Sequence, residues 1–194
     1  MKNIAIVGYK GKMGSLIFLF LKEKFDVVGV GKEDSLDNYS GIDLVIDFAS
    51  HESSLISAEY CLKNKIPIII GATGQTKDEE MRLNQIAQKI KVVKKANFSR
   101  GIEVLKNSLN AIIAGNPNSI EIIEKHHVNK KDAPSGTALE IKEYIEHICN
   151  KKVAITSIRE GLEMGEHIVK AYFNDETISL KHNVYSRNAF VLDQ

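Results

Sequence analysis

The sequence predicts an α/β protein: a Rossmann-like, doubly wound parallel sheet followed by a C-terminal α+β domain with a mixed or antiparallel sheet. Three observations support this class. Apolar runs alternate with helix-patterned segments over the first half of the chain. A glycine-rich loop separates the first apolar run from the first of these helices. Near the C-terminal end, three strand-like runs follow one another without a helix between them.

The first half alternates strands with helices. The predicted strands are apolar runs rich in β-branched residues, as expected where both faces of a sheet are buried: 3–7, 26–30, 44–48, 66–71 and 91–96. The helices between them place apolar residues three and four positions apart: 13–24, 53–64 and 77–89. Because parallel strands need right-handed crossovers, this order predicts βαβ units.

The pattern changes near residue 97, where we place a domain boundary between 1–97 and 98–184. The second part is predicted to contain helices over 101–114 and 138–149, and strands over 119–126, 153–160, 167–173 and 176–184. Gly115-Asn116-Pro117 ends the first of these helices. Asn174-Asp175 predicts a tight hairpin turn between the last two strands.

Composition excludes several classes of protein. The 194 residues carry 26 Lys+Arg against 25 Asp+Glu, so no global field attracts nucleic acid or an anionic membrane. Apolar runs are much shorter than the about 20 residues of a membrane span, and the start lacks the pattern of a secretory signal. Cys61 and Cys149 lie far apart in helix-like segments, which favours free thiols in a reducing cytoplasm.

The glycine loop after the first strand predicts nucleotide binding. Gly8, Gly11 and Gly14 would allow a tight turn, close approach of the backbone to a pyrophosphate, and close packing of helix on strand. The free N–H groups at the helix start favour phosphates. A plain strand–helix turn is the alternative. After the second strand, Lys32 could meet a 2′-phosphate and Glu33 a ribose hydroxyl, so we predict NADPH or NADH, with a slight preference for NADPH.

Three further loops end predicted strands at the same edge of the sheet. They are Asp47-Phe48-Ala49-Ser50, Gly71-Ala72-Thr73-Gly74 and Ala96-Asn97-Phe98-Ser99. Taken alone, each is also compatible with an ordinary turn of small residues. Ligands of such sheets bind beyond the carboxyl ends of the strands, so their recurrence there favours a ligand crevice.

A second functional stretch runs from His126 to Ala138 and reads HHVNKKDAPSGTA. If the strand over 119–126 continues through both histidines, His126 and His127 point to opposite faces and are poor joint ligands of one metal. Neither an H-E-x-x-H motif nor paired cysteines occur. We therefore predict no metal site.

The end of this stretch predicts an anion site at a helix start. Thr137 and Glu140 have the spacing of a capping box with Thr137 as N-cap. Ser135, Gly136 and Thr137 would then offer N–H groups and hydroxyls to a small acidic substrate, with Lys130 nearby. A solvated basic loop is the alternative. The remaining histidines lack such company in the sequence and are interpreted as surface or core residues: His51, His147, His167 and His182.

Taken together, these motifs carry a resemblance that covers nearly the whole chain. The run from Glu124 to Ala138 (EKHHVNKKDAPSGTA) follows the three loops at 8–14, 71–74 and 96–99, and precedes GEH at 165–167 and SRNAF at 186–190. The sequence thereby resembles the 4-hydroxy-tetrahydrodipicolinate reductase (dihydrodipicolinate reductase) family of bacterial lysine and diaminopimelate synthesis.

The resemblance implies a role for each motif. His126 would be the proton donor or acceptor and Lys130 a proton donor, while His127, Gly136 and Thr137 would bind the dicarboxylate substrate. The cofactor would contact three groups of residues: Gly8, Tyr9, Lys10, Gly11, Lys12 and Met13; Gly71, Ala72 and Thr73; Lys95, Ala96, Asn97 and Phe98. The family implies a homotetramer assembled through the C-terminal sheet, so 98–184 would bind substrate and oligomerise, and 185–194 would return to the nucleotide domain.

Two departures from the family pattern bear on these expectations. Gly31 and Lys32 stand where the family often has an acid followed by a basic residue, which weakens a preference for NADH. The sequence stops at 191–194, where the family continues into a helix that would cover apolar surface on the sheet, so stability and activity both depend on how the chain ends. A naturally short protein and a truncated gene are the two alternatives. The rival hypotheses are a non-catalytic nucleotide-binding relative and an enzyme of the semialdehyde dehydrogenase type. The latter needs a catalytic cysteine outside a helix.

Overall fold

The computed structural model describes residues 2–162 and 164–191. The chain divides into two compact units between Ala96 and Asn97. Each unit is built around its own sheet and its own apolar core. No helix among the described residues is long and apolar enough to cross a membrane.

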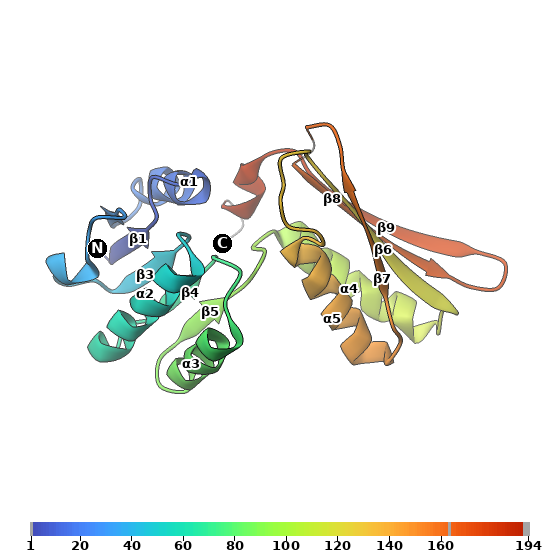
Figure 1. Ribbon diagram of the computed structural model, residues 1–194, viewed down its shortest axis with the longest axis horizontal. Helices are drawn as coiled ribbons and strands as arrows, with labels where there is room; N and C mark the ends of the chain where they lie inside the picture. The colour runs from blue at the N-terminus through green and yellow to red at the C-terminus, as the bar shows by residue number, and fades with distance from the viewer. Residues whose placement is uncertain (1, 163, 192–194) are drawn as a thin grey trace. The chain divides into compact units, whose positions relative to one another are not determined.

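The first unit is a parallel five-stranded sheet with helices on both faces, as predicted (Figure 1). Its strands are β1 (Asn3–Val7), β2 (Asp26–Val30), β3 (Leu44–Asp47), β4 (Ile68–Ile70) and β5 (Val92–Lys94), in the order β2-β1-β3-β4-β5. Helix α1 (Lys12–Leu21) lies on one face, and α2 (His51–Asn64) and α3 (Lys77–Ala87) lie on the other. The strand order reverses between β1 and β3, which is where sheets of this kind bind their ligands.

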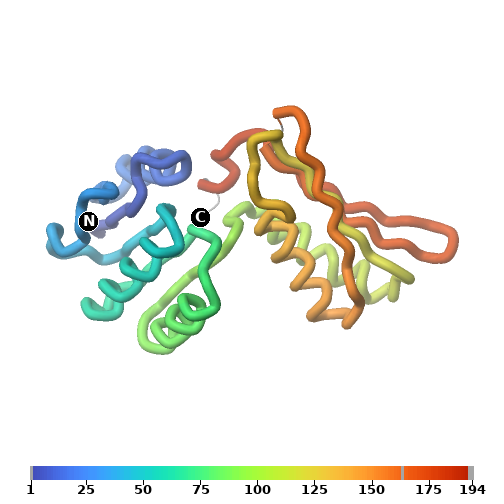
Figure 2. Tube along the Cα trace, in the orientation of Figure 1, coloured from blue at the N-terminus to red at the C-terminus, as the bar shows by residue number. Residues whose placement is uncertain are grey.

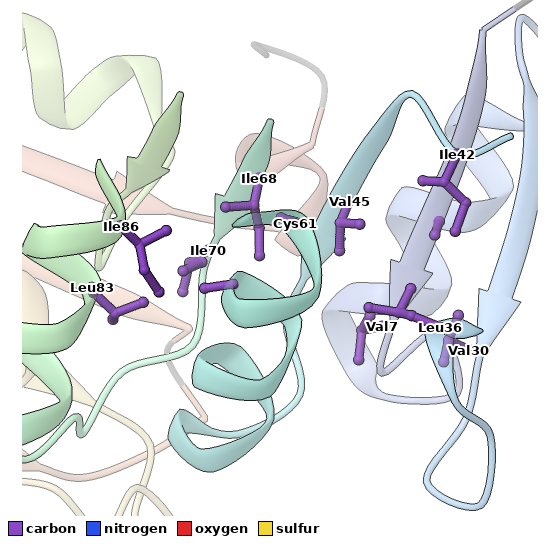
Figure 3. Close-up of a cluster of buried hydrophobic side chains, with 12 residues drawn as sticks. Val7, Val30, Leu36, Ile42, Val45, Cys61, Ile68, Ile70, Leu83 and Ile86 are labelled. Atoms are coloured by element: carbon purple, nitrogen blue, oxygen red, sulfur yellow. The ribbon is translucent and has the colours of Figure 1, made fainter. Parts of the chain in front are cut away.

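Buried aliphatic side chains of the strands and helices form the core of this unit (Figure 3). Val45, Ile68 and Ile70 project from the sheet toward Cys61 of α2 and Ile86 of α3. Each such side chain stabilises the fold by about 1.5–3 kcal/mol when fully buried. Side-chain caps fix the helix starts: Ser50 Oγ accepts from Ser53 N, and Thr76 and Glu79 form a capping box. A short 3₁₀ helix, η1 (Leu36–Asn38), follows β2.

The second unit has the predicted mixed sheet, with the order β7-β6-β8-β9. Strand β6 (Ser119–His126) pairs parallel with β7 (Ala154–Arg159) and antiparallel with β8 (Gly165–Tyr172), which pairs antiparallel with β9 (Thr177–Val184). Strands β8 and β9 run side by side as a long hairpin (Figure 2). Helices α4 (Arg100–Ala114) and α5 (Gly136–Cys149) cover one face of the sheet (Figure 1). A 3₁₀ helix, η2 (Arg187–Phe190), follows β9.

Alternation along β6 selects the side chains that face these helices. Ile120, Ile122, Glu124 and His126 are buried, while the residues between them are more exposed. The antiparallel register pairs Glu124 with His167 of β8. A strand that carries an apolar core at one end therefore carries an acid and a histidine on the same face at the other.

The predicted capping box at the start of α5 is wrong. The N-cap is Ser135, two residues before Thr137, and its Oγ accepts from Ala138 N at 3.2 Å. Partners from elsewhere in the unit engage both predicted cap residues. Thr137 Oγ1 accepts from Asn97 Nδ2, and Glu140 pairs with Lys106 of α4. The predicted return of 185–194 to the nucleotide domain stays a prediction, and its last three residues lie outside the described part of the chain.

Candidate active site

The glycine loop between β1 and α1 has the backbone geometry of a phosphate cradle. Gly8 adopts φ +79°, which favours glycine, and a Cβ at Gly14 would lie 2.2 Å from the Gly8 carbonyl oxygen. Helix α1 starts after Gly11, and no side chain of a described residue caps it. The first N–H groups of α1 are therefore available to an anion, in the positive field of the helix start.

A cavity of about 540 Å³ lies beside this loop, within the first unit. It is lined by the ends of three neighbouring strands: Gly8 after β1, Gly31 and Lys32 after β2, and Ala49 after β3. The volume lies in the usual range for cofactor pockets. Glycine cradle, helix start and cavity together fit a nucleotide with a pyrophosphate.

Asp34, which the sequence analysis did not single out, lies in the loop after β2. Asp34 Oδ2 accepts from Gly31 N at 2.9 Å, and a Cβ at Gly31 would lie 3.1 Å from the same oxygen. The Asp34 carboxylate thus occupies the space into which a side chain at position 31 would begin. Lys10 Nζ lies 4.0 Å from the same Cβ position. The Asp34 carboxylate and the Lys10 ammonium group therefore both lie at the position where folds of this kind recognise the cofactor ribose or its 2′-phosphate.

The other predicted cofactor residues of the first unit lie along the same strand ends. Gly71 follows β4, and a Cβ there would lie 2.1 Å from the Phe48 ring, so glycine allows that ring to pack. Thr73 is exposed and Ala72 is buried. Lys95 and Ala96 follow β5. Tyr9 packs its ring against Phe18 of α1 and over Gly29 of β2.

The second unit holds a buried carboxylate–histidine pair at the end of β6. Glu124 is fully buried, and its Oε2 forms a short hydrogen bond with Nδ1 of His126. Its other oxygen, Oε1, accepts from Arg159 Nη2 at 2.6 Å and from Ser135 N at 3.3 Å. Every one of these partners belongs to a different segment of the unit. His126 itself is 7% exposed.

His167 and His182 extend this pair into a cluster that was not predicted from their positions in the sequence, while the burial of His167 agrees with its interpretation as a core residue. The His167 ring packs edge-on against His126, with 5.3 Å between centroids, and lies 6.3 Å from the His182 ring. His167 Nε2 lies 3.3 Å from Ser135 Oγ. His51 and His147 lie outside the cluster, on α2 and α5.

Burial and charge set the protonation of this cluster. Burial lowers the pKa of His167 to about 3, so its ring is neutral. Burial also lowers the pKa of His126, and the Glu124 carboxylate opposes that shift. For Glu124, burial raises the pKa, but hydrogen bonds from Arg159, Ser157 and His126 outweigh it and bring the pKa to about 2. Glu124 is therefore ionised at neutral pH. Its hydrogen bond with Arg159 keeps that guanidinium near His126.

Lys130 lies in the loop after β6 and is held by an ion pair. Its Nζ donates to both carboxylate oxygens of Asp132 at 2.8 Å. Arg159 Nη2 donates to the Asp132 carbonyl at 2.6 Å, so the guanidinium also fixes the loop. His127 follows β6 and is half-buried. The structure thus gives the two predicted proton carriers different partners.

The start of α5 lies next to the carboxylate–histidine pair. Ser135, the N-cap, contacts Glu124 through its N–H and His167 through its hydroxyl. The N–H groups of Gly136 and Thr137 occupy the first helical positions and have no intrahelical acceptor. Asn97, expected to contact the cofactor, donates to Thr137 Oγ1 at 2.9 Å. An acidic ligand at these N–H groups would lie close to the histidine cluster.

Comparison with known proteins identifies relatives over both units. The model of the family "Dihydrodipicolinate reductase, N-terminus" matches residues 22–98, and "Dihydrodipicolinate reductase, C-terminus" matches 101–192. A 4-hydroxy-tetrahydrodipicolinate reductase of Caldanaerobacter subterraneus subsp. tengcongensis is 33% identical over 98% of this chain and 88% of its own. The enzyme of that name from Buchnera aphidicola subsp. Schizaphis graminum is 31% identical over 97% and 87%.

A solved structure shares the fold of the whole chain. Dipicolinate-bound dihydrodipicolinate reductase from Paenisporosarcina sp. TG-14 superposes with a TM-score of 0.76, at 21% identity over 100% of this chain and 91% of that one. The N-terminal family match begins at residue 22, beyond the glycine loop. The geometry of that loop is therefore separate support for the nucleotide-binding character of the first unit.

Proposed function

The chain belongs to the dihydrodipicolinate reductase family, and from that premise we propose that it reduces 4-hydroxy-tetrahydrodipicolinate to tetrahydrodipicolinate with NAD(P)H, in lysine and diaminopimelate synthesis. The observation that carries the proposal is the Glu124–His126 pair beside the open N–H groups of α5. It combines a group that can exchange a proton with a site for a substrate carboxylate. The cradle in the first unit fits the cofactor.

Each group of the second unit has a task in this reaction. The 4-hydroxyl of the substrate leaves as water, and NAD(P)H, when bound, would supply a hydride to C4 of the conjugated ring that results. The N–H groups of Gly136 and Thr137 hold one substrate carboxylate in the field of the α5 start. The protonated ring of His126, through Nε2, or Lys130, through Nζ, would deliver the proton that the enamine carbon next to the hydride-accepting carbon needs, an effect of typically about 10²–10⁴ on rate. Lys130 must loosen its contact with Asp132 to do so.

We propose that the protein can use either NADPH or NADH, with a slight preference for NADPH. Lys32 at the cavity and Lys10 near Gly31 supply positive charge for a 2′-phosphate. Asp34 supplies the acceptor that a ribose hydroxyl needs. Opposite charges at one subsite favour neither cofactor strongly.

We extend the proposal to a homotetramer located in the cytoplasm. Among the described residues, helices cover one face of the second sheet, and half-buried residues such as Ile123 and Ile168 lie on the other. Cys61 and Cys149 are free thiols, as suits a reducing compartment.

One assay tests the proposed reaction. The condensation product of pyruvate and aspartate semialdehyde is supplied, and oxidation of NADPH and NADH is followed by absorbance. Turnover with either cofactor is the expected result. Quenching of NADPH fluorescence without turnover would instead support the non-catalytic nucleotide-binding alternative.

A further inference from the structure

The buried carboxylate of the Glu124–His126 pair has no step of its own in the proposed reaction. Glu124 is fully buried on β6 and ionised, and an ionised carboxylate is retained inside a protein only when its oxygens are well satisfied. Resting on the proposed function, we infer that Glu124 is a positioning residue that fixes the tautomer and orientation of His126 and, through Arg159, the loop that carries Lys130.

Glu124 determines the tautomer of His126. An ionised carboxylate only accepts hydrogen bonds, so the nitrogen that faces Glu124 must carry a proton. That nitrogen is Nδ1, which leaves Nε2 as the atom that exchanges a proton with substrate. Nε2 lies against Gly165, where a Cβ would be only 3.0 Å away. A second group that orients a catalytic imidazole in this way is a recurring arrangement.

Glu124 is also linked to the loop after β6. Arg159 Nη2 bridges Glu124 Oε1 and the Asp132 carbonyl, both at 2.6 Å. The Asp132 carboxylate in turn holds Lys130 Nζ. One chain of contacts therefore runs from Glu124 to each proton carrier. Loss of the Glu124 charge would release the His126 ring directly. It would also leave the Arg159 guanidinium without its carboxylate partner, and so loosen the loop that carries Lys130.

Charges on several segments surround the His126 ring. The charged and titratable groups around His126 come from each neighbouring segment: Glu124 on its own strand, Arg159 on β7, Lys130 in the loop and His167 on β8. Behind His167 lie His182 on β9 and Ser135 at the start of α5, which contact His167. Among these charges, Glu124 raises the pKa of His126, whereas Lys130 and Arg159 lower it. Removing the negative charge therefore moves protonation of His126 to lower pH.

Three variants test the role. Glu124→Gln keeps the shape and removes the charge, and Glu124→Asp keeps the charge on a shorter stem. Glu121→Gln is the matched control because Glu121 lies on the same strand but contacts Tyr172 and Lys170 instead. kcat and KM are measured across pH for each, together with ¹⁵N chemical shifts of the His126 ring.

Glu124→Gln is expected to lower kcat by about 10²-fold or more, with KM for NADPH unchanged. The alkaline limb of its pH profile should move to lower pH by about one unit, since a single close charge shifts a pKa by that order. Glu124→Asp should recover part of the rate and most of the pH profile, and Glu121→Gln should match the parent.

Two results would overturn the inference. One is a Glu124→Gln variant with the parent's kcat and pH profile. The other, which needs no variant and so survives a folding defect, is a neutral His126 protonated at Nε2 in the unmodified protein. Absence of turnover in the unmodified protein would refute the proposed reaction instead, and the ring shifts would still decide the role of Glu124.

Discussion

Replacing Gly165 with alanine perturbs the position of the His126 ring without adding or removing a charged group. An added Cβ would lie 3.0 Å from Nε2 and 3.3 Å from Cδ2 of the ring. Ordinary contacts of a Cβ begin at 3.4 Å, so the ring must retreat by about 0.4 Å. It has little freedom to do so, because Glu124 holds Nδ1 and the His167 ring packs against it edge-on.

The displacement sets the size of the expected effect. A misplacement of about 1 Å at a reacting group costs about 10²-fold in rate, so 0.4 Å corresponds to a loss of roughly fivefold to tenfold in kcat. Overpacking a site of this kind costs about 1–3 kcal/mol of stability. KM for NADPH should not change, because the nucleotide cavity is lined by residues of the first unit alone.

Steady-state kinetics and urea unfolding of Gly165→Ala check both numbers. Gly115→Ala is the control, since a Cβ there would tighten contacts with Ile112 and Phe173 at the end of α4, away from the ring. It should lower stability and leave kcat intact. A Gly165→Ala protein that is destabilised but turns over at the parent rate would refute the claim that the position of His126 Nε2 matters to the reaction.

Three further predictions follow from the same geometry. Lys130→Ala should lower kcat by about 10²-fold or more while NADPH affinity, measured by fluorescence quenching, stays within twofold; normal turnover would remove Lys130 from the reaction. Asp34→Asn should raise the ratio of kcat/KM for NADPH over NADH by about fivefold, because it removes a negative charge beside the ribose, whereas Glu33→Gln, with no bond to Gly31, should not. Stability should fall as pH falls from 6.5 toward 3, because the unfolded His167 takes up a proton there and the folded one does not; at about 1.4 kcal/mol per pKa unit this amounts to about 2 kcal/mol at pH 5. Urea unfolding of the parent and of His167→Asn checks this, and equal slopes with pH would contradict it.

The two sheets could be predicted from sequence because their patterns are local. Continuous apolar runs such as 44–48 indicate strands buried on both faces, and β3 lies at the centre of the parallel sheet. Strand ends were less well predicted: β4 and β5 have three residues each, against six expected. The residues that flank these strands still bond to their neighbours, as Val45 N does to the Pro67 carbonyl and Lys95 N to the Ile70 carbonyl. The disagreement therefore lies at strand ends, which local patterns place least well.

The start of α5 shows how tertiary partners override a local motif. Thr137 and Glu140 have the spacing of a capping box, but Ser135 and Ala138 satisfy the same requirement two residues earlier. The choice depends on Asn97, which engages the Thr137 hydroxyl, and on Lys106 of α4, which attracts Glu140. Neither partner is near in sequence, so the local pattern alone predicted the wrong cap.

The histidine cluster, by contrast, was within reach of the sequence. A hairpin centred on Asn174-Asp175 pairs the residue seven before with the residue seven after, which are His167 and His182, and the structure has this pair. What the sequence could not supply is the partner strand: only the register between β6 and β8 sets His167 opposite Glu124. The buried Glu124 carboxylate then requires donors, and it finds them on β7, at the start of α5 and on His126. The need of this buried carboxylate for hydrogen-bond donors thus brings together groups assigned to the reaction. The site therefore follows from the sheet register and not from the spacing of residues along the chain.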